Sequence, residues 1–196
     1  MQEIVFITGN SGKVKALERR LQGTKYKVTQ ENIDIPEIQA ESAREIALFK
    51  ARYAYEQLRK PIVVQDSSFH INALKGFPGP YIKYVNETLG PYGLIRLMEG
   101  IEDRSCHFEL ALVFIDGDGE SHTFINGGAP GLLATEVYEG DSSESWSSLW
   151  KIYVSPKYGK TLAELSSEEL KDKETSKDDK SEFTQFIRWL KEQEEK

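Results

Sequence analysis

The stretch IVFITGNSGKVKALERRL, residues 4–21, decides the fold because it changes from strand to helix across one glycine turn. Residues 3–8 form a short, β-branched apolar run that stops at Gly9, which predicts a buried strand. Apolar residues then recur every three or four positions, which predicts a helix over residues 12–22 that stops at Gly23. A strand followed closely by a helix is how a parallel α/β sheet begins.

The segments that follow keep this order. A second strand is predicted near Tyr26–Thr29, and Pro36 makes the segment NIDIPEIQ extended rather than helical. A long helix is predicted over residues 41–59 and a buried strand over 61–66. Strand–helix–strand order with short links predicts parallel strands.

The middle and the end of the chain change in character. Residues 104–116 and 120–126 read as two long strands joined by the hairpin signal DGDG, and another strand is predicted over 131–138. The sheet is therefore expected to be mixed. Ser166 and Glu169 fit a capping box, and a last helix places four apolar side chains on one face: Phe183, Phe186, Ile187 and Leu190.

The composition limits the class of protein. Of 196 residues, 39% are hydrophobic and 29% are charged, which is typical of a globular chain. No run approaches the ~18 apolar residues of a membrane span, and no leader-like segment precedes the first strand. Cys106 is the only cysteine, so a reducing cytoplasm is the expected location. The net charge of −7 argues against a nucleic-acid partner.

The glycine turn at residues 9–14, GNSGKV, resembles a phosphate-binding loop but lacks two residues and the Ser or Thr of a P-loop. A glycine turn that leads into a helix still offers backbone N–H groups and the positive end of the helix dipole to an anion. Asn10 and Lys13 can add a donor and a charge. The alternative is an ordinary helix cap with a solvated lysine.

A second lysine and two carboxylates fit the same interpretation. Lys50 lies in the apolar stripe of its helix, so it either extends to solvent or faces an anion in a cleft. Asp66 is placed at the end of the strand over 61–66, where α/β sheets bind ligands, and Glu37 could face the same edge. Two carboxylates and two lysines suit a polyphosphate with bound Mg²⁺, or Mn²⁺ in its place. The alternative for Asp66 is a turn or helix cap.

Several blocks in order resemble the Ham1-type inosine triphosphate pyrophosphatases: FITGNSGK, DIPEIQ, ALFKA, VVQDSSFHINALKGFPGPYIKYV and GIEDRSCHFELALVFID. The resemblance covers residues 1 to about 130. It implies an α/β, Ham1/Maf-like (inosine triphosphatase-like) fold over 1–196: a single domain with a long central mixed sheet flanked by helices and two lobes with a cleft between them. It also implies a homodimer that uses Mg²⁺ to cleave ITP, dITP or XTP to monophosphate and pyrophosphate. Related septum-inhibitor-type pyrophosphatases fit the GFPGPY loop less well.

The resemblance also implies roles for individual residues. Lys13 and Lys50 would bind the triphosphate with Thr8 and Asn10, while Glu37 and Asp66 would hold the metal and activate water. The cleft would be lined by Ser67 and by the loop from Gly76 to Gly79.

The C-terminal part, residues 140–182, departs from the family pattern. Trp146 and Trp150 stand where the family has aromatic residues that stack on the base, although both could equally be core aromatics. The Ser-His-Arg triplet that holds the six-oxo group is absent, with Ser176 as the nearest match and Lys171 in place of an upstream lysine. The acidic pair of the family is reduced to Gln65-Asp66. Base preference is therefore expected to be altered.

Two functions remain open from the sequence. The first is an active nucleoside triphosphate pyrophosphohydrolase with altered base preference. The second is a catalytically impaired module that binds nucleotides or other proteins, an alternative that the neutral Gln65 and the missing triplet motivate.

Overall fold

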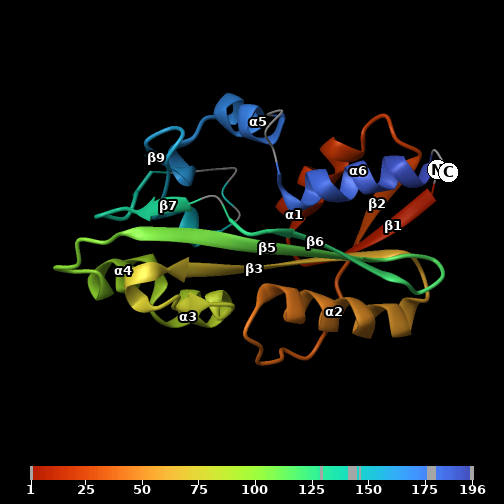
Figure 1. The fold of residues 1–196 in the computed structure, drawn as a ribbon, viewed down its shortest axis with the longest axis horizontal. Helices are drawn as coiled ribbons and strands as arrows, with labels where there is room; N and C mark the ends of the chain where they lie inside the picture. The colour runs from red at the N-terminus through yellow and green to blue at the C-terminus, as the bar shows by residue number, and fades with distance from the viewer. Residues whose placement is uncertain (1, 129, 141–144, 146, 176–179, 195–196) are drawn as a thin grey trace. The chain divides into compact units, whose positions relative to one another are not determined.

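The computed structural model describes residues 2–128, 130–140, 145, 147–175 and 180–194, which form two compact units (Figure 1). The first unit comprises Met1–Ser67, Leu110–Asn126 and Lys180–Lys196, and the second comprises Ser68–Glu109 and Gly127–Asp179. The nine strands found in the described residues belong to one mixed sheet, as expected from the sequence, and β3 and β5 contribute residues to both units. The single domain expected over residues 1–196 stays a prediction.

The first unit is built on parallel strands. β1 (Gln2–Ile7) lies between β2 (Tyr26–Glu31) and β3 (Ile62–Ile71), and both pairings are parallel. The second half of β5 (Ser105–Ile115) pairs antiparallel with β6 (Ser121–Asn126). The strands predicted at 3–8 and 120–126 are therefore confirmed within one residue.

Helices cover both faces of these strands because β1 alternates its apolar side chains. Ile4 and Phe6 belong to a core formed with α1 (Ser11–Leu21) and α6 (Glu182–Glu194). Val5 and Ile7 belong to a separate core with α2 (Ala43–Leu58), whose small side chains allow close packing: Ala43, Ala47, Ala51 and Ala54. Figure 1 shows α2 on one side of the strands, with α1 and α6 on the other.

The second unit is mostly antiparallel. β4 (Pro78–Gly79) pairs with β3, and β7 (Pro130–Leu133) pairs with both β5 and β8 (Tyr153–Ser155), which pairs with β9 (Lys160–Thr161). Its helices are α3 (Ile82–Thr88), α4 (Gly90–Leu97) and α5 (Ser167–Thr175). A third core unites these elements through side chains that include Phe69, Leu94, Met98, Leu133 and Ile152. The strand predicted over 131–138 is shorter in the structure, where β7 ends at Leu133.

The predicted C-terminal capping box is present at the start of α5. The Glu169 backbone N–H donates to the Ser166 hydroxyl at 3.2 Å, and the Glu169 carboxylate accepts from the Ser166 N–H at 2.8 Å. Among the helices in the described residues, none is long and apolar enough to cross a membrane.

Candidate active site

Asn10 shapes the glycine turn at the start of α1. Its Oδ1 accepts hydrogen bonds from the N–H groups of Gly12 at 2.9 Å and Lys13 at 3.3 Å. The Asn10 N–H donates to the Thr8 hydroxyl at 3.1 Å. The cap therefore satisfies these two amides, as in the helix-cap alternative, and binding of a phosphate by the turn stays a prediction. The turn also fixes Lys13 in the first turn of the helix.

Lys13 reaches from α1 to the backbone of β3. Its ammonium donates to the Gln65 carbonyl at 3.2 Å. Burial lowers the pKa of Lys13 below its ordinary value. The charges of Asp66 and Glu182 act in the opposite direction, and the nearby ammonium of Lys50 lowers the pKa further. Lys13 is half-buried, so an anion beside it would be screened by solvent less than at an open surface.

Lys50 approaches the same strand from α2. Its Nζ lies 2.8 Å from Asp66 Oδ2 and 3.4 Å from Glu37 Oε2. Lys50 and Asp66 each keep only 20% of their side-chain surface exposed, whereas Glu37 keeps 57%. Burial alone would lower the pKa of Lys50, but the charges and hydrogen bonds of Asp66 and then Glu37 raise it above its ordinary value. Lys50 therefore stays charged at neutral pH.

Asp66 does not end its strand, contrary to the expectation from sequence. β3 continues to Ile71, because its later residues pair with β4. Phe6 of β1 lies opposite Val63, and β1 ends one residue after Phe6, so Asp66 lies beyond the end of the neighbouring strand. Side chains alternate along β3, so Asp66 faces Lys50 on the α2 side. The Ser67 N–H fixes the carboxylate by donating to Asp66 Oδ1 at 3.0 Å.

Gln65 points to the other face of β3 and meets a residue that the sequence analysis missed. Its side-chain Nε2 donates to Oε1 of Glu182, the first residue of α6. Gln65 is 5% exposed and Glu182 is 2% exposed. One signal was present in the sequence: Glu182 lies four residues before Phe186, on the apolar stripe of its helix, as Lys50 does on α2.

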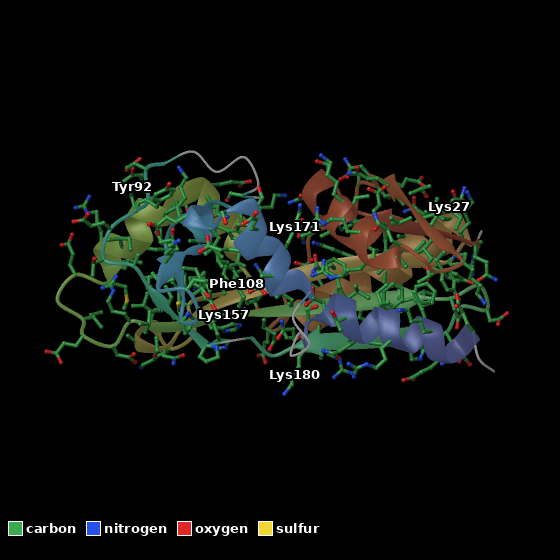
Figure 2. All side chains as sticks on the ribbon, turned by 90° about the horizontal axis from the view of Figure 1, so that it is seen from above. Lys27, Tyr92, Phe108, Lys157, Lys171 and Lys180 are labelled. Carbon is green, nitrogen blue, oxygen red and sulfur yellow. The ribbon has the colours of Figure 1, made fainter. Side chains whose placement is uncertain are left out.

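Gly79, expected to line the cleft, and the residues expected on the base side belong to the second unit or lie outside the described residues. Gly79 is buried in β4 with a φ of 59°, a conformation that favours glycine. Lys171 is exposed on α5 (Figure 2). Trp150 is half-buried against the core of the second unit, which favours the core alternative for this residue. Trp146 and Ser176 lie outside the described residues.

The fold and this cluster define an α/β protein with an ionic site beside its parallel strands, formed by Lys13, Lys50, Glu37 and Asp66. The sequence model of the Ham1 family matches residues 4–177, and the chain belongs to this family.

Similar proteins agree with this assignment. A dITP/XTP pyrophosphatase of Methanopyrus kandleri is 35% identical over 85% of this chain and 86% of its own length. A second dITP/XTP pyrophosphatase, from Thermococcus kodakarensis, is 32% identical over 96% of this chain and 97% of its own length. The structure of a HAM1 protein from Coxiella burnetii has the same fold, with a TM-score of 0.82, 22% identity, and coverage of 98% of this chain and 100% of that one.

Proposed function

We propose that this chain is a nucleoside triphosphate pyrophosphohydrolase, which cleaves the triphosphate between the α and β phosphates. The observation that carries the proposal is the convergence of Lys50 with two carboxylates, beside Lys13, at the end of β1. The curated names of its relatives, dITP/XTP pyrophosphatase and inosine triphosphate pyrophosphatase, support the substrate class.

Lys13 and Lys50 would bind the phosphates in this proposal. Both ammonium groups are partly withdrawn from water, so their attraction to an anion is screened less than at an open surface. Thr8 lies at the same end of β1, and its hydroxyl accepts from Asn10 while keeping a hydrogen to donate.

Glu37 and Asp66 suit a divalent cation. An oxygen of each already lies within 3.4 Å of one positive centre, the Lys50 ammonium, and carboxylate oxygens are the ligands that Mg²⁺ and Mn²⁺ take. Such an ion, when bound, would neutralise the charge that develops on the phosphate oxygens.

Asp66 would act as the general base. It would accept the proton of the water that attacks the α-phosphorus, as the bond to the bridging oxygen breaks and pyrophosphate leaves. Lys50 would orient this carboxylate, because its ammonium donates a hydrogen bond to Asp66 Oδ2 at 2.8 Å. The products are a nucleoside monophosphate and pyrophosphate.

The proposed substrates are deaminated or otherwise aberrant purine triphosphates, with a base preference that differs from the inosine type. The absence of a Ser-His-Arg triplet from the sequence supports this difference. The test is incubation with Mg²⁺ and a panel of normal and deaminated triphosphates, with Asp66→Asn as the control. Pyrophosphate release above that of the variant supports the function, and its absence for every triphosphate contradicts it.

A catalytically impaired nucleotide-binding module is the second candidate. The buried Gln65 favours it, because a neutral amide stands next to Asp66. Calorimetry that detects binding of a triphosphate by a chain that releases no pyrophosphate would support this candidate, whereas multiple turnovers would contradict it.

The proposed assembly is a cytoplasmic homodimer that binds neither nucleic acid nor membrane. One observation supports a second copy as partner: most of the large apolar side chains that are exposed lie on or beside α3 and α4, namely Phe77, Tyr81, Tyr84, Leu89, Tyr92 and Leu97. Figure 2 labels one of them, Tyr92 on α4. Light scattering should give twice the mass of 22.3 kDa, and a monomer at all concentrations would contradict the dimer.

A further inference from the structure

The helices α1 and α6 of the first unit enclose a cavity that the proposed reaction does not use. They pack against each other on the same side of the parallel strands (Figure 1). The cavity has a volume of about 310 Å³ and is lined by Arg20 of α1 and by four residues of α6: Thr184, Ile187, Arg188 and Lys191. Of these five described residues, three are cationic and none is acidic. Its charge is therefore opposite in sign to the net charge of the chain, which is −7.

The polar residues of α6 form a row along one side of the helix. Thr184, Arg188 and Lys191 follow one another at spacings of four and three positions, which places them on the same helical face. From the first to the last they extend about 10 Å along the helix axis, because a helix rises about 1.5 Å per residue. The α6 side of the cavity is thus a line of hydrogen-bond donors, with the apolar Ile187 among them.

Arg20 lines the cavity from α1 with its guanidinium fixed in place. Its Nη1 donates to the Ala16 carbonyl at 3.0 Å, and its Cζ lies 5.3 Å from the centre of the Phe183 ring. A guanidinium that is already oriented loses little conformational freedom when it binds an anion. Arg20 and Glu182 also attract each other, so the net positive charge of the cavity comes chiefly from the other two cations.

Arg188 and Lys191 are the two exposed cations of the cavity. Within the described part of the chain, neither forms an ion pair with a carboxylate. Glu192 follows Lys191 directly, but it does not line the cavity. Two like charges three positions apart on a helix repel each other, and an anion bound between them would remove that repulsion. The cavity therefore has both the charge and the space to take an anion.

We propose that this cavity binds a short chain of phosphate groups, at a site separate from Lys13 and Lys50. Guanidinium and ammonium groups are the side chains that proteins use to bind phosphate. The row of donors on α6 is longer than one phosphate group, so it favours two or more linked phosphates over orthophosphate. A volume near the lower limit for ligand sites suits a small ligand. The phosphates are either free, as in pyrophosphate, or part of a nucleotide. The proposal does not depend on the function proposed above.

The test is the rate at which Lys191 is acetylated at fixed pH and ionic strength. Mass spectrometry measures it relative to the exposed Lys60, which follows α2. The samples contain EDTA and one of three probes: pyrophosphate, orthophosphate or a dITP analogue that cannot be cleaved. Only the uncharged amine reacts, so an anion that raises the pKa of Lys191 by one unit lowers its rate about tenfold. Arg188→Gln removes one cation from the cavity, and Arg52→Gln, on the exposed face of α2, is the matched control.

Pyrophosphate should lower the relative rate at Lys191 several-fold in the wild type and in Arg52→Gln, and much less in Arg188→Gln. Orthophosphate should have little effect. Protection by the dITP analogue as well would identify a nucleotide as a ligand, whereas protection by pyrophosphate alone would identify a free phosphate chain. Thermal unfolding shows that the variants are folded.

Three results would overturn the proposal. The first is a relative rate at Lys191 that neither pyrophosphate nor the analogue changes. The second is equal protection in a folded Arg188→Gln chain, and the third is equal protection by orthophosphate. Because the readout is local to Lys191, it is unaffected by whether the chain hydrolyses a triphosphate, so the two proposals can fail separately.

Discussion

Replacing Asp66 by asparagine removes the charge that faces Lys50 and keeps the shape of the side chain. Lys50 still has Glu37 at 3.4 Å in the variant, so it is not left as a lone buried charge. The expected cost in free energy of unfolding is therefore about 1 kcal/mol, rather than the ~3–5 kcal/mol of an unpaired buried charge. In a chain of this size such a cost lowers the unfolding temperature by about 2–4 °C.

Hydrolysis should fall far more than stability. Loss of a general base typically lowers the rate by about 10²–10⁴-fold, which corresponds to about 3–5 kcal/mol of activation free energy. The assay is pyrophosphate release at saturating Mg²⁺ together with thermal unfolding of the same samples. Asp118→Asn, in the exposed turn between β5 and β6, is the control and should match wild type in both.

Two results would refute this reasoning. An Asp66→Asn chain that keeps more than about a tenth of wild-type activity does not use Asp66 as its base. A fall in unfolding temperature of more than about 10 °C would show that Asp66 chiefly stabilises the fold.

Three further outcomes are expected. Because burial lowers the pKa of Lys13 below 10.5, hydrolysis should begin to decline at a lower pH than it would with an ordinary lysine. Lys13→Arg should move this decline to higher pH, and profiles of kcat/KM against pH that coincide for the wild type and the variant would contradict this. Chelation by EDTA should abolish hydrolysis and added Mg²⁺ should restore it, whereas full activity in EDTA would exclude the Glu37–Asp66 metal site. Ser166→Ala should cost about 0.5–2 kcal/mol in urea unfolding, because it removes the cap of α5, and an unchanged midpoint would contradict that role.

Local patterns in the sequence predicted the elements that position the site. The glycine turn and the apolar spacing after it predicted β1 and α1, because a short chain segment determines both. The place of Lys50 in an apolar stripe left two alternatives, a lysine that extends to solvent or one that faces an anion in a cleft, and the structure has it 20% exposed beside Asp66 and Glu37. In each case the sequence pattern lies within a single helix or strand, or in two that adjoin in sequence.

Long-range pairing explains what the sequence did not predict. β3 continues past Asp66 because β4 pairs with its later residues, which no pattern within residues 61–66 indicates. α3 and α4 were not predicted, and their buried Val85 and Leu94 belong to a core shared with β5 and β7. Gln65 and Glu182 meet across 117 positions, so only the folded chain brings their charge and amide together.

The most direct test of the central claim is a crystal structure of the chain with Mg²⁺ and a dITP analogue that cannot be cleaved between the α and β phosphates. The account predicts the triphosphate against the ammonium groups of Lys13 and Lys50, and the metal on Glu37 and Asp66. A triphosphate bound away from both lysines, or a metal that contacts neither carboxylate, would contradict it.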